Sequence, residues 1–129
     1  MSQSPEDLLR SFELRATEQA ERAHRLSERL QAKSITVESP GGEVRLTVDS
    51  TGGLSALDFG SAARGLALER LAEVVLQTSR RAQAKLAESM GELVSQVYGS
   101  GSPTATFVAQ AYADRFPAPA GDERDGDRP

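Results

Sequence analysis

The fold is decided by residues 42–59, which read Gly42-Glu-Val-Arg-Leu-Thr-Val-Asp-Ser-Thr-Gly52-Gly-Leu-Ser-Ala-Leu-Asp-Phe59. Apolar and polar side chains alternate over residues 44–48, which is the pattern of a strand with one buried face. A glycine-containing turn follows at residues 49–53. Residues 54–59 then predict a further strand whose alternation is broken near Ala56, where we expect a bulge.

A first strand is expected just before this run, at Ile35-Thr-Val-Glu38. It is joined to the next strand by Ser39-Pro-Gly-Gly42, which places Pro40 and Gly41 at the central positions of a type II turn. Both glycine pairs are interpreted as hairpin turns, because neither is followed by the Gly-Lys-Ser/Thr of a phosphate-binding loop. The three strands therefore predict an antiparallel β-meander.

Long helices are expected on both sides of the meander. From Pro5 to Lys33 there is no glycine, Ser4 is placed to cap the first turn, and Gln19 is the only polar residue in a seam at helical spacing. The apolar and small members of that seam are Leu9, Phe12, Ala16, Ala23, Leu26 and Leu30. The second helix is expected to begin between Ser61 and Leu66 and to continue to about Val97. The predicted fold class is α+β, in the order long helix, three-stranded meander, long helix.

The lengths of the helices predict a dimer. Each helix spans about 40 Å, whereas a strand of five or six residues spans only about 17–20 Å, so part of each helix must project or pair with another chain. We therefore expect a homodimer with projecting helices. The residues predicted at its interface are Phe12, Leu26, Leu30, Val44, Leu46, Val48, Leu71, Val75, Leu86 and Met90.

Composition divides the chain into a domain over residues 1–98 and a tail over residues 99–129, which is rich in glycine, serine and proline and acidic at its end. Within the tail, residues 103–116 carry apolar residues every four positions after a Ser-Pro cap. Two interpretations stay open for this segment. It is either a short helix that docks on its own core or on a partner protein, or a disordered tail.

The chain of 129 residues has no cysteine, one histidine and a formal charge of −4. His24 lies between charged residues and completes neither a catalytic triad nor a metal-ligand cluster, so we expect no catalytic residue, no metal and no cofactor. The N-terminus lacks the apolar run of a signal peptide, and no stretch has the apolar length of a membrane span. We expect a cytoplasmic protein without membrane contact.

Basic residues gather beside the apolar seams even though the chain is acidic. On the first helix they form a stripe about 80° wide, and the stretch from Arg22 to Lys33 has four basic residues and one acidic residue, a local charge of +3. Such flanks either solvate a paired helix or contact the phosphates of a nucleic acid. The candidate nucleic-acid-binding residues are Arg15, Arg22, Arg25, Arg29, Lys33, Arg70, Arg81 and Lys85.

The run from Gly42 to Phe59, set between two long helices, resembles the YbaB/EbfC family of bacterial nucleoid-associated proteins, in a diverged, actinobacterial-type form. The resemblance covers roughly residues 10–97 and includes Leu76-Gln-Thr-Ser-Arg-Arg-Ala-Gln-Ala-Lys-Leu86. It implies a homodimer whose sheets join at the centre while the helices project like tweezers. It also implies non-catalytic binding of double-stranded DNA and a nucleoid-associated location.

A second hypothesis rests on departures from the family pattern. Charged Arg/Glu pairs stand on the first helix where relatives often carry glutamine and methionine, and Gly60-Ser61 replaces the Asp-Pro that often ends the third strand. Some chains that resemble the family serve type VII secretion systems as accessory or chaperone-like proteins. The alternative function is therefore a protein-binding accessory factor, with the partner held by the helix seam or by residues 103–116.

Overall fold

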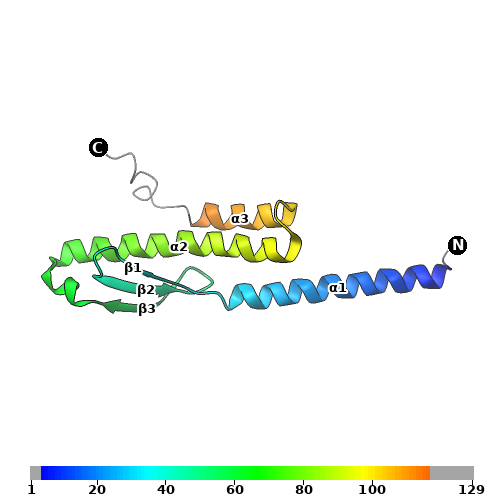
Figure 1. Ribbon diagram of the computed structural model, residues 1–129, viewed down its shortest axis with the longest axis horizontal. Helices are drawn as coiled ribbons and strands as arrows, with labels where there is room; N and C mark the ends of the chain where they lie inside the picture. The colour runs from blue at the N-terminus through cyan, green and yellow to red at the C-terminus, as the bar shows by residue number, and fades with distance from the viewer. Residues whose placement is uncertain (1–3, 117–129) are drawn as a thin grey trace.

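The structure is a computed structural model that describes residues 4–116 (Figure 1). It is an α+β fold in which a long helix, a three-stranded antiparallel sheet and a second long helix follow one another, as the sequence predicts. A further helix follows the second long one. The elements are α1 (Pro5–Gln31), β1 (Ile35–Glu38), β2 (Val44–Val48), β3 (Leu54–Phe59), the 3-10 helix η1 (Ser61–Gly65), α2 (Leu68–Tyr98) and α3 (Pro103–Arg115).

The sheet has the strand order β1-β2-β3, and α2 packs across β1 and β2. Val44, Leu46 and Val48 on β2 point toward α2 and are at most 1% exposed, so the predicted alternation is confirmed. Leu86 and Met90 on α2 are fully buried in the same core. The core therefore lies between the first two strands and one face of α2.

The turn between β1 and β2 differs from the predicted type II turn. The amide of Gly42 donates to the carbonyl of Ser39 at 2.9 Å, so Pro40 and Gly41 do hold the central positions. The left-handed residue, however, is Gly42 (φ 75°), and Gly41 has no positive φ. The type II prediction is wrong, because that turn requires a positive φ at its second central residue; a turn followed by a left-handed glycine connects the strands instead.

The bulge is confirmed in β3. Thr47 pairs with Ala56 and Val48 pairs with Leu54, so Ser55 is the extra residue between them. It lies one position before the Ala56 at which the alternation breaks. The extra residue is the local irregularity that such a break predicts.

Helix α1 begins as the sequence predicts, with the Ser4 hydroxyl accepting a hydrogen bond from the amide of Asp7 at 3.2 Å. Within residues 4–116, only its last turns contact the other elements: Leu26 is its single buried residue, and Leu30 packs against the core. The remainder projects past the end of α2 (Figure 1). We call residues 5–25 the arm and residues 26–31 the anchor.

Helix α3 lies along the face of α2 that points away from the sheet (Figure 1). It occupies the segment 103–116, for which the sequence allows either a docking helix or a disordered tail. The approach is close, because a Cβ added to Gly91 of α2 would lie 3.1 Å from the Cβ of Ala109. At its end, the ring of Phe116 rests on Gly52 in the turn between β2 and β3. Thus α2 is sandwiched between the sheet and α3.

Candidate nucleic-acid interface

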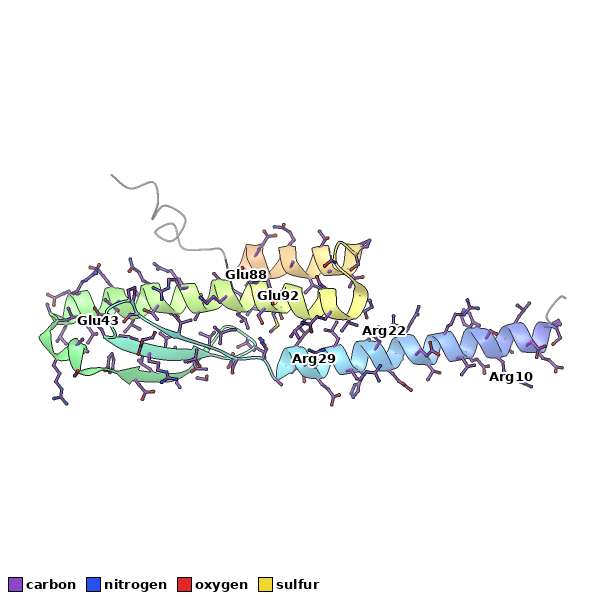
Figure 2. The ribbon with its side chains drawn as sticks, viewed as in Figure 1. Arg10, Arg22, Arg29, Glu43, Glu88 and Glu92 are labelled. Carbon is purple, nitrogen blue, oxygen red and sulfur yellow. The ribbon has the colours of Figure 1, made fainter. Side chains whose placement is uncertain are left out.

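The charge of α1 and its following residues is divided between two halves. Residues 5–21 hold two basic and five acidic residues, a charge of −3, and residues 22–33 hold four basic residues and one acidic residue, a charge of +3. Figure 2 shows Arg22 on the projecting arm and Arg29 close to the end of α2. The positive half therefore lies where the arm joins the body of the molecule.

Arg22 and Arg25 have the fewest side-chain contacts of the residues in the basic stripe. Both are exposed, and within residues 4–116 neither has an ion pair or a side-chain hydrogen bond. The imidazole of the nearby His24 instead lies 3.6 Å from the carboxylate of Glu28. Both guanidinium groups can therefore meet a phosphate without first breaking an internal contact.

Three other members of the α1 stripe have structural contacts or partial burial. The Arg29 guanidinium donates to the side-chain oxygen of Gln96 on α2 at 3.0 Å, which ties the anchor to the end of α2. Lys33 is half-buried. Arg15 is exposed, and its Nε donates to the carbonyl of Ser11 at 3.4 Å.

The predicted residues of α2 do not form one surface with the stripe. Arg70 lies 26 positions before Gln96, or about 39 Å along the helix, and it pairs with Glu73 at 3.2 Å. Arg81 donates to the carbonyl of Glu38 at 3.0 Å, so it joins α2 to the end of β1. Lys85 is exposed, about 16 Å along α2 from Gln96. Of these three residues, only Lys85 lies close to the stripe and has a side chain that forms no hydrogen bond or ion pair within residues 4–116.

The side of α2 next to α3 is acidic. Glu88 and Glu92 line the groove between the two helices together with Gln96 (Figure 2). Carboxylates repel phosphates, so this groove does not extend the basic surface. The basic stripe therefore does not continue across this side of α2.

Two carboxylates at the hairpin turns have altered electrostatics. The Ser39 hydroxyl donates to Glu43 at 2.7 Å and lowers the pKa of that carboxyl. The hydroxyl and amide of Thr51 donate to Asp49 at 2.6 and 2.9 Å and lower its pKa. Because each charge is held by groups of its own turn, both carboxylates stabilise turns.

The residues predicted at the dimer interface fall into three groups. Phe12 lies on the arm with 66% of its surface exposed. Leu30, Leu71 and Val75 are half-buried at the edge of the core. The other six side chains are buried within the single chain and leave little or no surface for a second copy: Leu26, Val44, Leu46, Val48, Leu86 and Met90.

An apolar surface that the sequence reasoning did not assign to an interface lies on β3. Every residue of this strand is exposed, including Leu54, Leu57 and Phe59, the last at 54%. Among the described residues, β3 is an edge strand, since it pairs only with β2. The alternation that predicts the strand carries no information on which strand lies at the edge.

Within residues 4–116, every helix falls short of the length or apolar character that crossing a membrane requires. The same part of the chain contains no group of three or more histidine, cysteine or acidic residues placed to hold a metal ion.

Residues 10–101 match the sequence profile of the YbaB/EbfC DNA-binding family. The matched span begins in the arm, includes the whole sheet and α2, and ends just before α3. No curated protein sequence matches the chain. Because the profile covers well over half of the chain and the order of elements agrees with the resemblance noted from the sequence, this protein belongs to the YbaB/EbfC DNA-binding family.

Proposed function

We propose that this chain is a non-enzymatic, nucleoid-associated protein that forms a homodimer and binds duplex DNA through phosphate contacts, with little sequence selectivity. The observation that carries the proposal is the +3 charge of residues 22–33. The guanidinium groups of Arg22 and Arg25 contribute to this charge, and both are exposed and without internal partners in the described part of the chain. Phosphate contacts position a protein on DNA without reading its bases, so a stripe of arginines predicts binding to unrelated duplexes.

The dimer is supported by β3. An edge strand leaves a row of backbone groups unpaired, and here that edge also exposes Leu54, Leu57 and Phe59. A second copy of β3 would satisfy both features at once. A two-fold dimer also presents each basic stripe twice, which gives an acidic protein a local positive surface.

DNA binding is tested with the double variant Arg22→Gln/Arg25→Gln, which leaves the Arg29–Gln96 contact in place. The charge-matched control is Arg45→Gln/Arg64→Gln, two exposed arginines outside the stripe. Retardation of two unrelated duplexes is measured over a range of salt concentrations. We expect the stripe variant to bind both duplexes at least tenfold more weakly, with the salt slope lowered by about 2 to 4, since each lost phosphate contact removes about 0.9. The control should bind nearly as the natural protein does.

The DNA proposal fails if the natural protein retards no duplex at low salt, or if the two variants lose affinity equally. The dimer is tested separately by sedimentation of Leu57→Asp/Phe59→Asp against Leu68→Asp, an exposed leucine outside β3. We expect only the β3 variant to sediment as a monomer. A natural protein that is monomeric at micromolar concentration would refute the dimer.

A further inference from the structure

The apolar side of the arm is left unexplained by phosphate contacts. Leu9, Phe12, Ala16, Gln19 and Ala23 recur at alternating intervals of three and four residues, which places them along one line of α1. We call these five residues the arm seam. Leu9 and Phe12 are 59% and 66% exposed. Phosphates offer no apolar surface to such side chains, so phosphate contacts on the basic flank leave the seam in water.

The anchor shows what this spacing is suited to pack against. Leu26 and Leu30 continue the seam at the same intervals, and there they pack in the core cluster that includes Leu93 on α2. In the anchor the line of apolar residues therefore contacts a helix. The arm presents the same pattern beyond the end of α2, where no described element covers it (Figure 1).

The charges beside the arm seam indicate which kind of helix can pack on it. Arg15 and Arg22 each precede a seam residue by one position and form one flank, while Glu6 and Glu13 lie on the other flank. If two arms paired antiparallel with Phe12 against Ala23, Arg15 of one copy would lie near Arg22 of the other, and the like charges would repel. A parallel pair would set the arginines against Ala20 and Ser27, which offer no charge. A second arm is therefore a poor occupant, and an acidic flank is a good one.

We propose that the arm seam binds an amphipathic helix of another protein, whose apolar side packs on Leu9, Phe12, Ala16 and Ala23 and whose acidic flank faces Arg15 and Arg22. The seam runs over 15 residues, or about 21 Å from the first to the last, so it accommodates a partner helix of four turns. The apolar line is separate from the phosphate contacts, whereas Arg22 belongs to both surfaces, so DNA and the partner helix would compete for that arginine.

The probe is a labelled synthetic peptide of three heptads with leucine at the two core positions, glutamate at the flanking position that faces Arg15 and Arg22, and alanine at the other flanking position, which faces Glu6 and Glu13. Its matched counterpart carries lysine in place of each glutamate. Binding to the full chain is followed by fluorescence anisotropy. We expect the glutamate peptide to bind at least tenfold more tightly than the lysine peptide, because only the former complements Arg15 and Arg22.

Two variants of the arm locate the binding surface. Phe12→Asp, which changes the most exposed large side chain of the seam, should weaken binding of the glutamate peptide at least tenfold. Leu14→Asp changes a side chain of similar exposure, 62%, that lies off the seam, and it should leave binding within twofold. Both positions are exposed, so both variants should keep the circular dichroism of the natural protein.

The proposal is overturned if neither peptide binds, if both bind equally, or if the two variants behave alike. It is also overturned if Phe12→Asp lowers the sedimenting mass of the protein while the glutamate peptide fails to bind the natural chain. That result would assign the seam to a second copy. Unchanged DNA affinity in Phe12→Asp supports the proposal, since it separates the seam from the phosphate contacts.

Discussion

The contact between Gly52 and Phe116 joins the end of α3 to the turn between β2 and β3, and it predicts a specific energetic coupling. Gly52 has φ 86°, a conformation that costs alanine about 1 kcal/mol. A methyl group there would also overlap the ring of Phe116 and force it off the turn. Loss of that half-buried ring from its site adds about 1 kcal/mol, so Gly52→Ala should cost about 2 kcal/mol in the free energy of unfolding.

Gly42 provides a matched control, because it has φ 75° but no atom near the position of an added Cβ. Gly42→Ala should cost only the backbone contribution, about 1 kcal/mol. In a Phe116→Ala background, Gly52→Ala should fall to the same value. The coupling between Gly52 and Phe116 should thus be about 1 kcal/mol, whereas Gly42 and Phe116 should not couple.

Urea denaturation followed by circular dichroism at 222 nm measures these differences, with all variants at one protein concentration because a dimer's stability depends on it. A Gly52–Phe116 coupling below about 0.3 kcal/mol would refute the reasoning. A coupling of equal size between Gly42 and Phe116 would also refute it, since that would show a general effect of the left-handed backbone on the two turns.

Three further predictions concern the core and the turns. Leu86→Ala, at a fully buried position, should lower the free energy of unfolding by about 2–5 kcal/mol in urea denaturation, and a loss below 1 kcal/mol would contradict its place in the core. Gly60→Ala should cost about 1–3 kcal/mol in the same assay, since its Cβ would overlap the carbonyl oxygen of Gly42 and backbone must move. Because the Thr51 hydrogen bonds lower the pKa of Asp49 from its ordinary 3.8, its charged form stabilises the fold above that value and the gain is lost as the pH falls through the lowered pKa. Thermal melts should therefore show Asp49→Asn less stable than the natural protein at pH 7, with the difference shrinking below pH 3.8 and not growing.

The order of elements was predictable because each one has its own periodicity. Val44, Leu46 and Val48 define the buried face of β2, and Ser4 defines the start of α1. The start of α2 is less predictable: the sequence places it between Ser61 and Leu66, but residues 61–65 form a 3-10 helix and α2 begins at Leu68. Helix boundaries of this kind depend on tertiary packing, which local patterns do not report.

The candidate site was predictable only in part, since a helical stripe records direction around an axis and not the neighbours of each side chain. Arg22 and Arg25 are exposed as a phosphate-contacting role requires. Arg81 lies in the same kind of stripe but bonds to the carbonyl of Glu38, and Arg70 lies far along α2. Both outcomes depend on how α2 crosses the sheet, which no local spacing encodes.

The single attachment of α1 makes it a lever. Residues 5–25 extend about 32 Å beyond Leu26, while the pivot is limited to a few contacts such as Leu26, Leu30 and the Arg29–Gln96 hydrogen bond. A tilt of about 10° at this pivot would carry the Pro5 end through about 5 Å, nearly half the width of a DNA major groove. Small changes in side-chain packing at the end of α2 would therefore become large changes in the reach of the arm.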